Sequence, residues 1–169
     1  MKRSSIVIGV ILALLSAPLA AQTFRHELSF FGSFDYMDEP VDLDRTVLNI
    51  RYGHYFSEQL VGTLALGRES YRVTGPDTTL TSFTAGAKYY FGLPRRTTFV
   101  PFLEAAIGFA TIDVPGVGDE TDLTWEIGGG GAYFITDSTS ADVSLRWYHT
   151  DTSASTEGMR IFLGLTTRF

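Results

Sequence analysis

Three absences restrict what this chain can be. Its 169 residues include no cysteine, which excludes disulfide frameworks and cysteine-ligated metal or redox sites. Lysine and arginine number 13 against 19 aspartate and glutamate residues, and this acidic balance argues against a nucleic-acid partner. No apolar run reaches the ~20 residues that a membrane-spanning helix needs. The stability of the fold therefore has to come from a packed core or from a closed sheet.

The one extended apolar run, Ile6 to Leu15, lies at the N-terminus. Lys2 and Arg3 precede it, and a small-residue stretch at 17–21 follows it, which is the order of a cleaved secretory signal peptide. We predict a signal peptide over residues 1–21 and export of the rest, with an N-terminal anchor as the alternative. Residues 22–169 are then expected to form one domain, because they contain no linker or low-complexity segment.

Alternation of apolar and polar residues dominates the rest of the chain and predicts eight strands. Strands of a soluble sheet usually have about 5 or 6 residues, whereas a tilted strand needs ~9 to 11 to cross a bilayer. The predicted strands are of the longer kind, which favours a membrane protein. They cover residues 24–36, 46–56, 60–69, 80–91, 98–110, 122–135, 140–149 and 159–169.

The connections between these strands alternate in length. Segments 37–45, 70–79, 111–121 and 150–157 are predicted as long connections, and those between them as short. Short periplasmic turns and longer outer loops are typical of outer-membrane barrels. We therefore predict an all-β, eight-stranded antiparallel up-and-down transmembrane β-barrel in the outer membrane of a Gram-negative type of cell, with both termini in the periplasm. A soluble lipocalin-like barrel, whose apolar face would point inward, is the alternative.

Three segments resemble the small eight-stranded outer-membrane barrels of the OmpA and OmpX type: ELSFFGSFDY at 27–36, VPFLEAAIGFA at 100–110 and FLGLTTRF at 162–169. The likeness is a pattern of alternation that extends over the whole chain after the signal peptide. It implies surroundings of outer-membrane lipid and lipopolysaccharide, and recognition of the last strand by the barrel-assembly machinery. Thr167 stands where such barrels often carry an aromatic residue. The residues implied in the assembly signal are Leu163, Leu165 and Phe169.

Charged residues gather on the face of the strands opposite the apolar residues. An eight-stranded barrel is just wide enough for its own side chains to fill, so charges inside it have to be paired. We predict an interior salt-bridge network, centred on Glu104, that plugs the lumen; a gated or leaky pore is the alternative. The predicted members are Glu27, Arg51, Lys88, Glu104, Glu126, Asp142, Arg146 and Arg160.

The three histidines show neither HExxH nor His-x-x-x-His spacing, so no metal ion and no other cofactor is expected. The segment around His149 resembles outer-membrane lipid A deacylases, in which a His-x-Ser pair and a carboxylate act on an acyl ester. Asp151 stands at the position of that serine. A nucleophile would then have to be Ser153 or Ser155, with Glu157 as the orienting acid. The simpler interpretation of His149 is a polar residue at the membrane interface.

These observations predict a monomeric, non-enzymatic barrel with a structural or surface-interacting role. It would support membrane integrity, or bind a host or cell-surface ligand through its outer loops. A small-solute pore and a lipid A-modifying enzyme are the alternatives, because a barrel fold does not by itself determine an activity.

Overall fold

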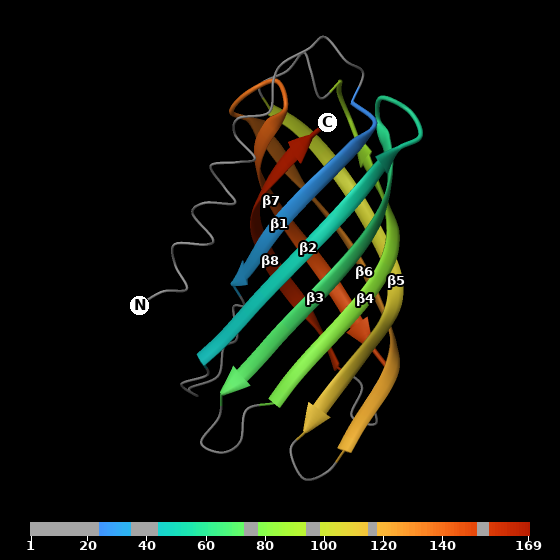
Figure 1. Ribbon diagram of the computed structural model, residues 1–169, viewed down its shortest axis with the longest axis vertical. Coiled ribbons are helices and arrows are strands. Elements are labelled where there is room, and N and C mark those ends of the chain that lie inside the picture. The colour runs from blue at the N-terminus through green and yellow to red at the C-terminus, as the bar shows by residue number, and fades with distance from the viewer. Residues whose placement is uncertain (1–23, 35–43, 73–77, 94–98, 115–117, 152–155) are drawn as a thin grey trace.

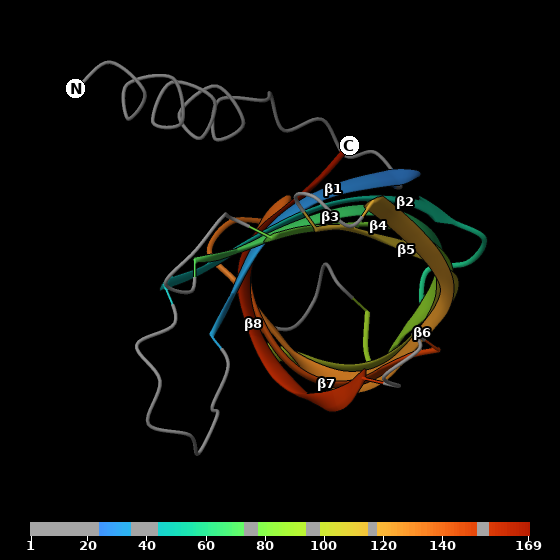
Figure 2. The ribbon, with the colours of Figure 1, turned by 90° about the horizontal axis from the view of Figure 1, so that it is seen from below.

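The computed structural model describes residues 24–34, 44–72, 78–93, 99–114, 118–151 and 156–169. Eight strands form a closed barrel, in which each strand pairs with its neighbours in sequence and β8 pairs with β1 (Figures 1 and 2). Every pairing is antiparallel. The predicted fold class is therefore confirmed. The strands are β1 (His26–Phe34), β2 (Asp44–Tyr55), β3 (Leu60–Arg72), β4 (Thr78–Tyr90), β5 (Phe99–Val114), β6 (Gly118–Phe134), β7 (Thr139–Thr150) and β8 (Thr156–Arg168).

The strands β5 and β6 are longer than predicted. The segment 111–121 was expected to be a long loop, and this expectation was wrong: Thr111 pairs with Thr121 and Asp113 with Asp119. β-Branched residues pair well across strands, and the Oγ1 atoms of the two threonines lie 2.9 Å apart. Gly118 begins β6 with a φ of 113°, a conformation that glycine adopts readily. Gly118 is therefore the first residue of a strand, although it was predicted to lie in a loop.

Alternation along the strands places apolar side chains on the outside and charges on the inside. On β2, the side chains of Leu48 and Ile50 are 54% and 40% exposed. The next residue, Arg51, points to the other face and is 2% exposed. In a soluble barrel the apolar face would instead be buried in the interior. The lipocalin-like alternative is therefore excluded. No helix within the described ranges is long and apolar enough to cross a membrane.

Exposed aromatic side chains encircle one end of the barrel. This end carries the short turns and the C-terminal residue (Figure 1), and we call it the terminus end. Aromatic rings at such a boundary are typical of the girdles of outer-membrane barrels. The exposed rings at the terminus end are Phe56, Phe91, Phe99, Tyr133 and Phe169.

Candidate functional site

Charged side chains fill the lumen in three groups along the barrel. The groups lie at the terminus end, at mid-height, and toward the opposite end, as the positions of their residues on the strands indicate. Each group contains both acids and bases. All eight residues predicted for the interior network lie on the inward face of their strands.

The central group joins strands from opposite sides of the barrel. The carboxylate of Glu104 on β5 accepts hydrogen bonds from Arg51 on β2 and from Arg146 on β7. Glu126 on β6 provides a second carboxylate, with its Oε1 at 3.1 Å from Nη2 of Arg51 and 3.5 Å from Nη1 of Arg146. Glu104 and both arginine side chains are at most 5% exposed, and Glu126 is 18% exposed. Two acids and two bases thus meet across the lumen at mid-height.

Aromatic rings cover the two central guanidiniums. The Cζ atom of Arg146 lies 4.1 Å from the ring centroid of Phe162 and 5.1 Å from that of Phe31, and Arg51 lies 5.5 Å from Phe31. A cation over an aromatic face is stabilised by the ring quadrupole. Gly164 on β8 makes room for one of these rings, because a Cβ there would lie 2.3 Å from Cδ1 of Phe31. Phe31, an apolar residue on an otherwise polar face of β1, is therefore part of the lumen filling.

The group at the terminus end is built on Glu27 of β1. Its Oε2 accepts hydrogen bonds from the hydroxyls of Tyr55 at 2.8 Å and Tyr90 at 3.1 Å. Lys88 and Arg168 each place a nitrogen 3.7 Å from the same carboxylate. Glu27 is fully buried, so these partners replace the water that an exposed carboxylate would bind.

Arg168 extends this group across the barrel. Its guanidinium donates hydrogen bonds to Tyr55 on β2 at 3.0 Å, Tyr90 on β4 at 2.9 Å and Ser140 on β7 at 3.0 Å. Arg168 was not among the predicted members of the network. The signal was available, because Arg168 has the same alternation parity as Arg160 on the last strand.

Asp142 is the second acid at the terminus end. Lys88 places Nζ 3.3 Å from its Oδ2. The hydroxyls of Ser140 and Thr166 donate to the carboxylate at 2.6 and 2.7 Å. Asp142 is 3% exposed, so its charge is held entirely by protein groups and not by bulk water.

The group at the opposite end pairs Arg160 on β8 with Glu69 on β3. The guanidinium of Arg160 also lies 4.1 Å from the ring centroid of Tyr148. Glu69 was not predicted to join the network, although it is the last residue of the predicted strand 60–69 and has the same alternation parity as Thr63 and Ala65. With Glu69 and Arg168 added, the ion-paired acids and bases of the described lumen are equal in number. The acids are Glu27, Glu69, Glu104, Glu126 and Asp142, and the bases are Arg51, Lys88, Arg146, Arg160 and Arg168.

The residues considered for a deacylase-like site are only partly brought together. Nε2 of His149 lies 2.9 Å from Oδ1 of Asp151, and Nδ1 lies 3.7 Å from Oε2 of Glu157. Ser153 and Ser155, the two candidate nucleophiles, lie outside the described residues. The structure thus places carboxylates at both nitrogens of His149, and no described serine contacts the ring.

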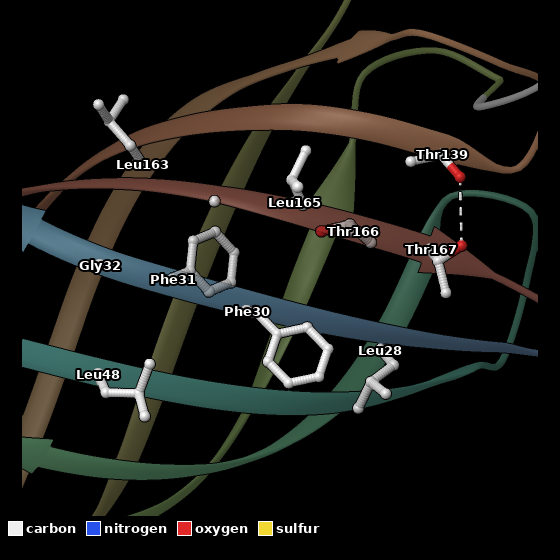
Figure 3. Close-up of a pocket in the computed structure, with 11 residues that line it drawn as sticks. Leu28, Phe30, Phe31, Gly32, Leu48, Thr139, Leu163, Leu165, Thr166 and Thr167 are labelled. Carbon is white, nitrogen blue, oxygen red and sulfur yellow. Dashed lines mark hydrogen bonds between the residues drawn. The ribbon is translucent and has the colours of Figure 1, made fainter. Parts of the chain in front are cut away.

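Of the residues considered for an assembly signal, Leu163 and Leu165 lie on the outer face of β8, and Phe169 directly follows this strand. Leu163 is 47% exposed and Phe169 54%, whereas Leu165 is half-buried. Thr167 has the same alternation parity as these three residues, but it is buried and its hydroxyl lies 3.2 Å from that of Thr139 (Figure 3). A hollow of about 380 Å³ runs along this seam between β1 and β8, with apolar walls that include Phe30. The outer surface along β1 and β8 therefore has a hollow and a buried threonine, which alternation alone does not predict.

Comparison with known proteins identifies the fold. A family model for the outer membrane protein beta-barrel domain matches residues 7–169. No curated protein sequence matches the chain. In the part of the chain that the structure describes, no group of three or more His, Asp or Glu side chains could hold a metal ion.

Several solved structures share the barrel at low sequence identity. The N-terminal beta-barrel domain of Pseudomonas aeruginosa OprF is 21% identical, with a TM-score of 0.62 over 87% of this chain and 98% of that one. Neisserial surface protein A is 17% identical, with a TM-score of 0.64 over 89% and 100%. The Yersinia pestis outer membrane protein Ail is 14% identical, with a TM-score of 0.59 over 87% and 100%. At these identities the likeness shows the fold alone.

Proposed function

Because the chain belongs to the outer membrane protein beta-barrel domain family, we propose that it is a monomeric, non-enzymatic barrel with a plugged lumen. It supports the integrity of the outer membrane or presents surface-binding loops, and it does not conduct solutes. The single observation that carries this proposal is the bridge of Glu104 to Arg51 and Arg146 across the barrel. Its surroundings are outer-membrane lipid and lipopolysaccharide, and the barrel-assembly machinery inserts it.

The energetics of the central bridge support a closed lumen. A solute that passed mid-height would have to separate buried guanidiniums from the carboxylates of Glu104 and Glu126. Separating a buried ion pair leaves uncompensated charge, which costs several kcal/mol.

The organisation of the chain fits an exported protein. We propose that residues 1–21 are removed during export and that residues 22–169 form the mature barrel, with the terminus end in the periplasm. Contacts with a host or cell-surface ligand would then be made at the opposite end. The acidic stretch Asp38-Glu39-Pro40-Val41-Asp42 lies between β1 and β2 in the sequence, and it is outside the described residues.

Conductance measurements test the plug. Protein purified from outer membranes and reconstituted in planar bilayers should give no reproducible conductance steps, under conditions in which a general porin conducts. Cells that lack the protein should become more sensitive to detergents and to large antibiotics, and the wild-type chain should restore their resistance. Regular conductance steps from the wild-type protein would contradict the proposal and favour the small-solute pore.

Lipid analysis separates this proposal from the deacylase alternative. Mass spectrometry of lipid A should give the same acylation pattern for cells that express the wild-type chain and for cells that express His149→Ala. Loss of an acyl chain in the wild-type cells alone would assign an enzymatic role to His149 and overturn the non-enzymatic proposal.

A further inference from the structure

Two histidines face each other on the outer wall at the terminus end, away from the charged lumen. His26 on β1 and His54 on β2 are direct partners in the strand register. Their Nδ1 atoms lie 3.4 Å apart, and their ring centroids 5.0 Å. The hydroxyl of Tyr52 lies 2.6 Å from the same Nδ1 of His26. Two imidazole nitrogens and a phenol oxygen therefore meet at one point of the outer surface.

The spacing of the two nitrogens suits a shared metal ion. Two ligands of a tetrahedral ion with Zn–N bonds of ~2.0–2.1 Å lie roughly 3.3 Å apart. We propose that His26 and His54 bind one divalent transition-metal ion, such as Zn²⁺ or Cu²⁺, through their Nδ1 atoms. The Tyr52 hydroxyl and water are available for the remaining positions. Imidazole ligands suit these ions, whereas Mg²⁺ and Ca²⁺ prefer oxygen.

The surroundings hold the two rings in place and leave them accessible. An edge of Phe56 faces His54 with 5.4 Å between ring centroids, and Phe169 lies 5.7 Å from His26. Packing of this kind limits ring rotation, which lowers the entropic cost of binding an ion. Tyr52 is 40% exposed and His54 is also exposed, and the pair lies beside the aromatic rings Phe56 and Phe169 of the terminus end, so an ion with its remaining water can reach it at the membrane interface.

The barrel, and not a local motif, creates this pair. The two histidines are 28 residues apart, and they meet because β1 and β2 are antiparallel neighbours. Sequence patterns such as HExxH detect ligands on a single helix and cannot detect a pair across strands. With two imidazoles from the protein, the ion would keep open positions and exchange with solvent. It would bind only the folded barrel, so it should raise the unfolding temperature.

Calorimetric titration tests the site. The barrel is purified from outer membranes without a polyhistidine tag, treated with a chelator and titrated with Cu²⁺ or Zn²⁺. We expect one equivalent to bind, no binding of Mg²⁺, and release of the ion at acid pH because the ligand nitrogens must be deprotonated. His26→Gln and His54→Gln should each abolish the single equivalent. His149→Gln, which changes the histidine near the opposite end, should retain it.

Two further measurements establish that each variant is folded and that nitrogen atoms bind the ion. Heat-dependent gel mobility establishes that each variant is folded before it is titrated. Co²⁺, used as a spectroscopic probe, should give visible absorption bands of nitrogen coordination with the wild-type barrel and not with His54→Gln. If the wild type binds no ion, the short contact is only a hydrogen bond between the two rings, and the proposal is wrong. Equal binding by the wild type and His54→Gln would also overturn it.

Discussion

At the scale of single residues, Glu104 is the acid at the centre of the ion pairs that cross the lumen. Two buried guanidiniums, from Arg51 and Arg146, share its carboxylate. In Glu104→Ala these cations keep, among the described acids, only the ion pair with Glu126, which is partly exposed. Removal of one partner of a buried ion pair typically costs about 3–5 kcal/mol. We expect a loss of roughly this size in the free energy of unfolding, measured by denaturant titration of the barrel in detergent with tryptophan fluorescence as the signal.

A variant with the same change of charge separates pairing from net charge. Asp119 lies exposed on β6, and Asp119→Ala removes one negative charge without disturbing the lumen. Its unfolding midpoint should equal that of the wild type. If Asp119→Ala and Glu104→Ala lowered the free energy of unfolding equally, the cause would be the overall charge. An unchanged unfolding midpoint in Glu104→Ala would contradict the network.

The sequence could predict the side of the sheet for each charged residue and that Glu104 is central, but not which base pairs with which acid. The two-residue period of a strand determines which face a side chain occupies, and this period alone predicts that Glu104 points inward. The pairing of Arg51 with Glu104 depends on how far the strands are staggered around the barrel. That stagger depends on all eight strands together, so no local pattern carries it.

At the scale of the strands, Gly128 and Gly130 of β6 are required by the close approach of β7. A Cβ on Gly130 would lie 2.0 Å from the backbone oxygen of Val143 and 2.9 Å from Cζ of Phe102. Because backbone atoms cannot move aside cheaply, Gly130→Ala should destabilise the barrel by about 1–3 kcal/mol, the usual cost of overpacking. Denaturant titration in detergent measures the loss.

The matched control for this strand is a glycine with space around it. A Cβ on Gly32 of β1 would have its nearest neighbour at 3.8 Å, the backbone oxygen of Val47. Gly32→Ala should therefore leave the unfolding midpoint unchanged. If Gly32→Ala and Gly130→Ala were equally destabilising, the cause would be a general need for glycine in strands and not the contact with β7.

The ends of the strands were harder to predict than their faces. Residues 111–114 and 118–121 extend the hairpin of β5 and β6, although the whole segment 111–121 was predicted as a long connection. Turn residues predict that a chain reverses, but they do not determine how far pairing continues before the reversal. Cross-strand contacts decide this, and here the paired threonines Thr111 and Thr121 favour continuation.

At the scale of the whole molecule, closure of the sheet joins the two ends of the chain. β1 pairs with β8 from Glu27 with Arg168 to Phe34 with Ile161, so no strand edge is left unpaired among the described residues. An unpaired edge in lipid would cost several kcal/mol for each backbone group. The number and length of the strands predict this closure. The hydrogen bonds that reinforce it inside the lumen depend on the three-dimensional arrangement of the strands, which alternation does not determine.

Arg168 provides a direct test of how the interior reinforces the closed barrel. Its guanidinium joins β8 to Tyr55 on β2, Tyr90 on β4 and Ser140 on β7. The wild-type barrel should migrate as a folded species in detergent gels and shift on heating. Arg168→Ala should shift at a lower temperature, because loss of a buried, paired cation costs about 3–5 kcal/mol. Arg68→Ala removes an exposed arginine on β3 and should behave as the wild type. If both variants shift at the wild-type temperature, these contacts do not limit the stability of the barrel, and its closure rests on the backbone pairing of β1 with β8.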